Sequence, residues 1–404
     1  MIMATHSNRP ATEAGGGVRK RAGTFVTQQA GPASYKAFIP RGLLPPPTLS
    51  IDGALQSAIE RAGVELGRLD GTTLLLPDTE LFVRMYARKE ALLSSQIEGT
   101  QSTLSDLIIY EHGDLPVDPA SDVVEVANYL KAMRYGLQRV KDGHPVTLRL
   151  LRKIHELLLT GVRGGTKTPG EFRRSQNWIG GTRPGDAVYV PPPPHEMIAA
   201  LGDFELFLNS DAIELGMPLL IRTGIAHAQF ETIHPFLDGN GRVGRLLITF
   251  LLCASGTLRE PLLYLSLYLK QHRSHYYELL QRIRTHGDWE GWLAFYLDGV
   301  ANVAAQATNT ARELVALFEQ DRAVVTTKGT GTLGRVFEHV RRELVVTTTG
   351  TATAVGVTFP TAATALRRLE AAGILQEIAN SNQRTYFYGK YLHILNDGVE
   401  GHAG

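Results

Sequence analysis

The sequence contains a single cysteine, Cys253, in 404 residues, so it cannot form an internal disulfide. Its N-terminus also lacks the hydrophobic region of a signal peptide, and together these features lead us to expect a cytoplasmic protein. No segment approaches the roughly 20 uncharged apolar residues of a membrane span, so we expect no membrane association. The 41 Lys and Arg nearly balance the 40 Asp and Glu, which leaves no overall attraction to nucleic acid or acidic lipid. A partner must therefore be recognised by a local site.

Apolar residues recur at helical spacing through most of the chain, and we find no internal repeat. This periodicity predicts helices over 49–67, 78–98, 121–140, 148–160, 195–208, 218–231, 242–255, 261–284, 289–296 and 301–320. The length allows two or three domains. We therefore predict a mainly α fold in which a compact helical body holds most of the chain.

The composition changes towards both ends of the chain. Residues 1–34 are mostly rich in Gly, Ala, Ser and Thr and are predicted to form a flexible N-terminal arm, and the prolines that follow favour an extended segment. We expect an N-terminal helical domain over 35–120 and a core over 121–325. A third unit, 326–404, has shorter helices and Thr-rich turns.

The third unit is predicted to contain three helices and then two paired strands. The helices fall at 333–345, 351–355 and 361–372, and the strands at 374–378 and 384–388, joined by 379–383. This order resembles a small winged helix-turn-helix domain, in which Arg367, Arg368 and Arg384 would contact DNA phosphates. Because a winged helix also docks proteins, the sequence leaves both kinds of partner open.

The most informative stretch is His-Pro-Phe-Leu-Asp-Gly-Asn-Gly-Arg-Val-Gly-Arg, residues 234–245. The Gly-Asn-Gly core allows positive φ angles and aims backbone amides at one point, and a predicted helix starts directly after it. We therefore expect an anion-binding site at a helix N-terminus, with phosphate as its ligand.

The side chains of this stretch each suit one task in phosphate chemistry. His234 can take a proton from an attacking hydroxyl. Asp238 is a hard oxygen ligand suited to Mg²⁺. Arg242 and Arg245 lie about one helical turn apart and can bind the same polyphosphate. A helix-capping turn with an incidental histidine accounts for any one of these residues, but not for all of them together.

A second motif, Ser-Ser-Gln-Ile-Glu-Gly at 94–99, ends the helix predicted over 78–98. Ser94 and Glu98 are four residues apart and share a helix face. Taken alone, Glu98 reads as an ordinary solvated carboxylate. A third segment, 170–194, predicts a β-hairpin with strands at 176–179 and 187–190, although a plain connecting loop has a similar sequence.

Residues 234–245 resemble the signature of the Fic family, His-Pro-Phe-x-Asp/Glu-Gly-Asn-Gly-Arg-x-x-Arg, and meet every specified position. The resemblance implies a Fic-type helical bundle with a β-hairpin flap, which moves AMP from ATP to a Ser, Thr or Tyr hydroxyl of a protein and releases pyrophosphate. It implies His234 as the catalytic base and Asp238 as the Mg²⁺ ligand. The implied nucleotide-binding residues are Gly239, Asn240, Gly241, Arg242, Gly244 and Arg245.

The same resemblance assigns further roles. A kinase branch of the family carries lysine where this chain has Gly241, so the glycine favours nucleotidyl transfer. The motif at 94–99 is similar to the family's inhibitory helix, which implies that Glu98, supported by Ser94, pairs with Arg245 and keeps the activity low. The 170–194 segment resembles the flap that holds the target side chain, with Ile179 and 188–190 as its edge.

Several functions remain open at this point. The first is protein adenylyl transfer, possible also on the chain itself, with ATP, target hydroxyl side chains and a second copy of the chain as partners. The second is a DNA-binding regulator that senses nucleotide through the same site. Removal of AMP from a modified protein, or transfer of another nucleotide, would use many of the same residues.

Overall fold

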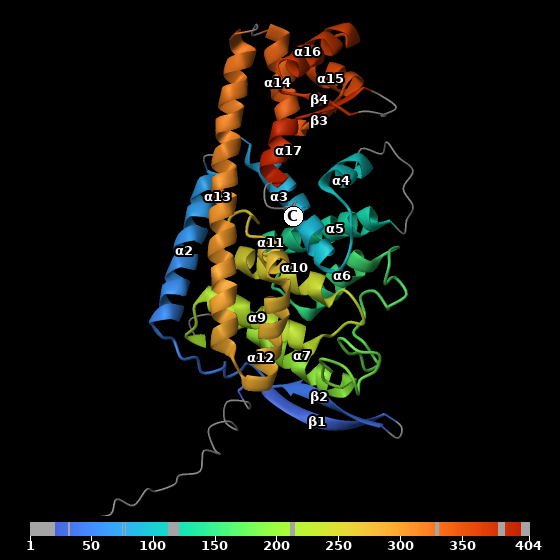
Figure 1. Cartoon of the computed structure of the whole chain (residues 1–404), viewed down its shortest axis with the longest axis vertical. Coiled ribbons are helices and arrows are strands. Elements are labelled where there is room, and N and C mark those ends of the chain that lie inside the picture. Colours follow the sequence, from blue (N-terminus) through green and yellow to red (C-terminus); the bar gives the residue numbers. More distant parts are fainter. Residues whose placement is uncertain are drawn as a thin grey trace, which may run out of the picture.

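The structure is a computed structural model that describes residues 21–30, 33–74, 76, 78–111, 121–210, 215–327, 331–378 and 384–396. Helices dominate it, so the predicted mainly α fold is confirmed. Figure 1 shows a helical body with a smaller C-terminal unit at one end, and α13 (Trp289–Thr327) running along both. No helix in the part of the chain that the structure describes is long and apolar enough to span a bilayer.

The centre of the body is α9 (Leu219–Ile233), whose residues are buried except Leu219 and Arg222. A helix that is apolar on nearly all sides needs neighbours on all sides. Those neighbours include α10 (Asn240–Ala254), α7 (Pro194–Asn209), α12 (Arg273–His286) and α13. The 234–245 stretch therefore comprises the loop between two strongly buried helices, α9 and α10, and the first turns of α10.

Three further helices cover α10 on its other side. α5 (Asp122–Lys141) packs against both α6 (Leu148–Leu159) and α10, and α3 (Thr79–Ile97) crosses beside α5. The short α4 (Leu104–Glu111) follows α3. Through this arrangement the C-terminal end of α3, which carries the 94–99 motif, lies against α10.

The predicted N-terminal arm is partly wrong. β1 (Gly23–Ala30) and β2 (Ala33–Pro40) form an antiparallel hairpin, in which Phe38 is fully buried. Composition alone missed it because its strands are anchored by the body, where the Phe38 amide donates to Val190 O at 2.9 Å. Residues 1–20, the rest of the predicted arm, lie outside the described residues.

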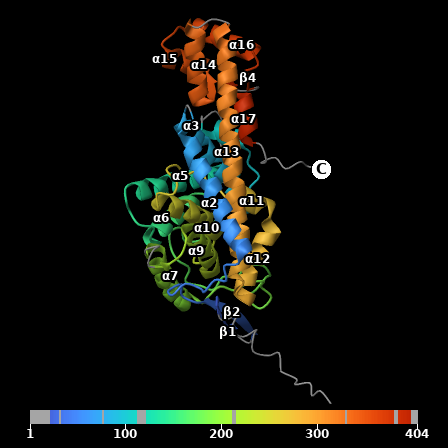
Figure 2. The ribbon, with the colours of Figure 1, turned by 90° about the vertical axis from the view of Figure 1, so that its left-hand side faces the viewer.

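The helix expected over 49–67 is α2 (Gly53–Thr73), whose start is set by the Asp52 carboxylate, which accepts from the Leu55 amide. It packs along α13, and Figure 2 shows the two helices side by side. The two helices predicted over 289–296 and 301–320 are one continuous helix, α13. Gly299, which lies between the two predicted helices, serves close packing: a Cβ there would lie 2.7 Å from Tyr268 Cδ1.

The single helix predicted over 261–284 is also wrong. The structure has α11 (Ser266–Gln271) and α12, separated at His272, whose φ and ψ of −111° and 31° leave the helical range. Residues 270–275 are all polar, but the apolar spacing on either side of them hid this break in the helix.

The C-terminal unit begins after α13. Its elements are α14 (Gly331–Glu343), β3 (Val345–Thr347), α15 (Thr348–Val355), α16 (Phe359–Ala371), β4 (Gln376–Glu377), β5 (Thr385–Phe387) and α17 (Gly389–Asn396). The expected pairing of the last two strands is confirmed, and β3 adds a third strand in the order β3-β5-β4. Residues 379–383, the predicted strand connection, lie outside the described residues. The winged-helix classification stays a prediction.

The C-terminal unit also touches the helix that carries the 94–99 motif. α17 packs against α3, and Arg84 of α3 donates from Nη2 to the Arg342 carbonyl at 3.1 Å. Tyr391 of α17 is buried, and its ring stacks on Phe318 of α13 with 5.8 Å between centroids.

Candidate active site

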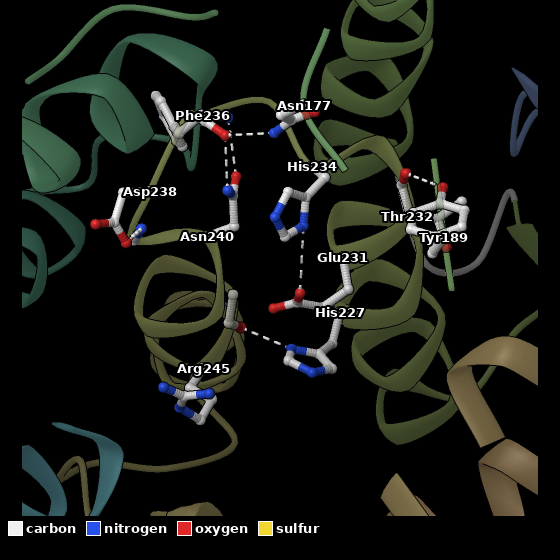
Figure 3. A network of polar contacts seen from close by, with 12 residues as sticks. Asn177, Tyr189, His227, Glu231, Thr232, His234, Phe236, Asp238, Asn240 and Arg245 are labelled. Atoms are coloured by element: carbon white, nitrogen blue, oxygen red, sulfur yellow. Dashed lines mark hydrogen bonds and ion pairs between the residues drawn. The ribbon is translucent and has the colours of Figure 1, made fainter. Parts of the chain in front are cut away.

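The stretch 234–239 forms a tight loop between α9 and α10 (Figure 3). His234 ends α9 in the left-handed conformation, with φ 49° and ψ 61°, which few non-glycine residues adopt. Two hydrogen bonds hold this conformation: the His234 amide donates to Phe230 O at 2.9 Å, and Arg173 Nε donates to His234 O at 3.0 Å. The backbone around the imidazole is therefore fixed from both sides.

The Asn240 side chain locks the loop from within. Its Oδ1 accepts from the Phe236 amide at 2.9 Å, and its Nδ2 donates to the Phe236 carbonyl at 2.8 Å. Asn177 donates to the same carbonyl at 2.9 Å. Both polar atoms of the Asn240 side chain thus bond to the loop, and the nucleotide contact that the sequence assigned to Asn240 stays a prediction.

We expect Asn240→Ala to lower the free energy of unfolding by about 2–4 kcal/mol, because it removes two buried hydrogen bonds and leaves the Phe236 amide unpaired. Urea denaturation of the purified chain measures this change. Asn302→Ala is the matched control, since Asn302 is an exposed helical asparagine and its loss should cost far less. Equal losses for the two variants would contradict the locking role.

His155 of α6 supports the loop from the side of Asp238. Its Nδ1 accepts from the Gly170 amide at 2.9 Å, so its Nε2 carries the proton and donates to the Asp238 carbonyl at 3.0 Å. The ring stacks on Phe236, with 3.8 Å between centroids. Burial lowers the pKa of His155 to about 4, which keeps the ring neutral. Sequence analysis missed His155 and Arg173, because nothing in their local sequence marks them.

The expected contact between Glu98 and Arg245 is present. Arg245 Nη2 donates to Glu98 Oε1 at 2.8 Å, and the same guanidinium donates to Ser94 Oγ at 2.8 Å and to Ser94 O at 2.9 Å. The Arg245 side chain is 2% exposed and that of Glu98 31%. Both motifs predicted from the sequence thus meet at one guanidinium.

The Glu98 carboxylate lies over the N-terminus of α10. A Cβ added at Gly241 would collide with Glu98 Oε1, so the carboxylate sits almost on the Gly241 backbone. Burial alone would raise the pKa of Glu98, but the charge and hydrogen bond of Arg245, together with Arg242 and His234, lower it overall. An ionised carboxylate therefore occupies the place where a helix N-terminus binds phosphate.

Arg242, which the sequence assigned to the polyphosphate, is bound by an acidic residue in the structure. Its Nη1 donates to Glu125 Oε2 of α5 at 3.2 Å, and its Nη2 lies 3.7 Å from Asp238 Oδ1. Glu125 is buried and also pairs with Arg163 at 3.3 Å. Both Arg242 and Arg245 are thus held by acidic partners, and Glu125 is a site residue that the sequence did not reveal.

The glycines of the stretch divide into two kinds. Gly239 caps α10 with a left-handed φ of 78°, as an anion-binding turn requires. Gly244, expected to contact the nucleotide, instead packs against α9: a Cβ there would lie 2.6 Å from Glu231 Oε1 and 3.2 Å from Phe230 Cδ1. A contact between Gly244 and the nucleotide stays a prediction.

Asp238 suits a metal bound mainly by phosphate and water. Its side chain is 42% exposed, and Oδ1 accepts from the adjacent Gly239 amide at 2.6 Å. Within the described ranges, no group of three or more His, Cys, Asp or Glu could hold a metal ion. Mg²⁺ usually takes one or two carboxylates and fills its shell with phosphate oxygens and water, so this donor set fits it only together with a phosphate ligand.

The predicted hairpin at 170–194 is reduced to one β-bridge, between Ile179 and Tyr189. The two predicted strands thus pair at one antiparallel bridge only, because Val190 O bonds to β2 and the Tyr189 hydroxyl donates to the buried Thr232 carbonyl. Of the expected edge, Ile179 and Val188 are exposed, Val188 by 67%, whereas Tyr189 and Val190 are buried.

Comparison with known proteins gives a consistent result. Residues 56–138 match the model of the Fic/DOC family N-terminal region, and residues 145–252 match that of the Fic/DOC family. The chain is similar to the protein adenylyltransferase Fic of Aedes aegypti, 33% identical over 229 residues, which is 55% of this chain and 42% of that protein. The corresponding protein of Culex quinquefasciatus is 32% identical over 220 residues, 52% of this chain and 41% of that protein.

The chain thus spans less than half the length of these curated relatives. Its fold is similar to the crystal structure of a Fic family protein from Desulfovibrio desulfuricans G20, with a TM-score of 0.54 and 21% identity over 84% of this chain and 97% of that one. Both the 94–99 and the 234–245 motifs lie within the matched regions. Residues 56–138 and 145–252 are therefore similar to the two regions of Fic/DOC family proteins.

Proposed function

We propose that this chain transfers AMP from ATP to a Ser, Thr or Tyr hydroxyl of a target protein and releases pyrophosphate. The observation that carries the proposal is the convergence of a neutral imidazole, a helix N-terminus and a buried guanidinium at one loop. The name of the similar insect proteins, protein adenylyltransferase Fic, supports the same reaction class.

In this reaction the hydroxyl oxygen attacks the α-phosphorus, the bond to the β-phosphate oxygen breaks, and the hydroxyl proton passes to His234. Burial, with the charges of Arg284 and Arg173, lowers the pKa of His234 to about 3. The ring is therefore unprotonated near pH 7 and has a free nitrogen to accept the proton. The negative phosphates of bound ATP would raise its basicity.

The remaining residues bind and neutralise the triphosphate. The Gly239–Gly241 turn and the first amides of α10 would hold phosphate oxygens, and Arg245 would bind the far end of the triphosphate. Asp238 would hold Mg²⁺, which supplies positive charge to the phosphates when bound. Arg242, paired with Glu125, would help to position Asp238 and would add positive charge next to the bound phosphates.

Glu98 would act as an intramolecular inhibitor of this reaction. Its carboxylate occupies both Arg245 and the space above Gly241. A phosphate cannot use the same guanidinium and helix end while the carboxylate is there. ATP would then bind, if at all, with its phosphates displaced from in-line attack, and a displacement of about 1 Å can cost a hundredfold in rate.

The decisive experiment is an intact-mass measurement of the Glu98→Gly chain after incubation with Mg²⁺ and ATP, alone and with an extract that contains candidate targets. We expect protein species heavier by one AMP. A gain matching another nucleotide would correct the donor, and loss of AMP from a modified protein would reveal the reverse reaction. If α-labelled ATP leaves no covalent label on any protein, the proposal is overturned in favour of a nucleotide-sensing, DNA-binding regulator. Homodimer formation and a cytoplasmic location stay predictions.

A further inference from the structure

Glu231 lies one helical turn before His234 and its carboxylate faces the imidazole (Figure 3). The distance from Glu231 Oε2 to His234 Nδ1 is 3.9 Å, and the two side chains are 8% and 18% exposed. Neither His234 Nδ1 nor Glu231 Oε1 has a hydrogen-bond partner among the described residues. The unpartnered Nδ1 thus lies 3.9 Å from Oε2 of a carboxylate whose other oxygen, Oε1, is also unpartnered.

Packing gives the Glu231 carboxylate its place. Oε1 lies against Gly244 of α10, where any larger residue would collide with it. From the other side, Arg284 of α12 donates from Nη2 to the Glu231 carbonyl at 3.2 Å and from Nε to Thr232 Oγ1 at 3.3 Å. The glycine that the sequence assigned to nucleotide binding is therefore what makes room for this carboxylate.

We propose that Glu231 is a positioning residue for His234. It accepts a hydrogen bond from Nδ1–H, which leaves the lone pair of Nε2 free to take the proton of the attacking hydroxyl. This inference rests on the proposed function. Hydrogen bonds at active sites are often long before substrate binds, so the 3.9 Å gap is expected to close by a small rotation of the two side chains when ATP and the target bind.

The proton balance of this step is simple. The hydroxyl proton moves to Nε2, the ring becomes an imidazolium, and the Glu231 carboxylate stabilises its positive charge through Nδ1–H. A carboxylate that orients a histidine base plays the same part in hydrolytic triads. No other co-reactant is required, because the proton returns to solvent or to pyrophosphate after the product leaves.

Charged and titratable groups surround Glu231. Those that face it from other elements are Arg245 of α10, Glu98 of α3, Arg284 and Tyr276 of α12, and Tyr189. Burial, more than the charge of Glu98, raises the pKa of Glu231 to about 7, while Arg245 and Arg284 lower it. The ionised form that orients His234 therefore grows as the pH rises through about 7, and removal of Glu98 favours it.

The test compares Glu231→Gln and Glu231→Asp in the Glu98→Gly chain. The glutamine variant is expected to lower kcat for AMP transfer by roughly a hundredfold with little change in KM for ATP, and to abolish the rise of rate around pH 7. The aspartate variant keeps the charge and should recover part of kcat. A purely structural role would instead move thermal stability without changing the pH profile.

A second readout does not depend on AMP transfer. NMR of ¹⁵N-histidine-labelled chain, with His234 assigned by comparison with His234→Asn, reports which ring nitrogen carries the proton. We expect Nδ1–H in the parent chain and a shift towards Nε2–H in Glu231→Gln. If no variant transfers AMP, the proposed function fails, whereas the NMR result still decides the pairing.

The matched control is Glu278→Gln. Glu278 and His275 form an exposed pair on α12, with 3.3 Å between Oε2 and Nδ1, so the same change is made beside a histidine that has no place in the site. It should leave kcat and the His234 spectrum unchanged. An unchanged His234 tautomer in Glu231→Gln, or a kcat equal to that of its parent, would overturn the proposal.

Discussion

Glu98→Gly is expected to raise the rate of AMP transfer roughly a hundredfold over the wild-type chain. The substitution removes the carboxylate that binds Arg245 and covers the α10 N-terminus, so the guanidinium and the amides become available to the triphosphate. Transfer is measured with α-labelled ATP at saturating Mg²⁺, as initial rates of label on protein.

Glu80→Gly is the control for this experiment. Glu80 lies on the same helix but at its exposed N-terminal end, far along the chain from the site, so its loss should leave the rate at the wild-type level. If Glu98→Gly and wild type label proteins at equal rates, Glu98 is no inhibitor, and its contact with Arg245 serves stability alone.

The same substitution has a cost in stability. Arg245 keeps its bonds to Ser94 but loses its charged partner, and an uncompensated buried charge is strongly destabilising. We expect Glu98→Gly to melt at a lower temperature than wild type, and ATP with Mg²⁺ to raise its melting temperature more than that of wild type, because the phosphates replace the carboxylate.

The second large effect is expected for His234. In the Glu98→Gly chain, His234→Asn should lower AMP transfer by about 10²–10⁴-fold, the range that a general base contributes. Asparagine is chosen because it tolerates the left-handed φ of 49° at this position, so the loop can keep its shape.

His234→Asn is expected to lower the rate of AMP transfer without weakening ATP binding. ATP affinity, measured by calorimetry, should change little, since the triphosphate contacts come from α10. His275→Asn, which alters an exposed histidine, should leave transfer intact. Full transfer by His234→Asn would remove the imidazole from the reaction and leave the phosphate-binding residues as the whole catalytic apparatus.

The parts of the site that sequence analysis could predict are contiguous in the chain. Twelve adjacent positions carry the base, the metal ligand and the anion-binding turn, and the family resemblance supplied the partner of Arg245. The residues it missed reach the loop from elsewhere in the fold: His155 from α6, Arg173 before the bridge, Glu125 from α5. Each acts through a contact more than 60 residues away in sequence, which no local pattern records.

The errors in the predicted fold also arise from contacts between residues distant in sequence. The break expected between 296 and 301 is absent, because Gly299 packs closely against Tyr268 within one continuous helix. The first hairpin was missed because burial of Phe38 against the body, and not strand composition, stabilises it. Tertiary packing decided the structure at both places.

The contact between α17 and α3 has a consequence for how inhibition is relieved. The packing of α17 and the Arg84–Arg342 hydrogen bond tie α3 to the C-terminal unit, while Glu98 caps the C-terminal end of the same helix. Because α3 is one continuous helix, its C-terminal end cannot move far without disturbing its contacts with the C-terminal unit. If Glu98 is withdrawn by a movement of α3, the contact at Arg84, about four helical turns away, would have to loosen as well. A molecule that binds the C-terminal unit is therefore expected to change the rate of AMP transfer without contacting the nucleotide.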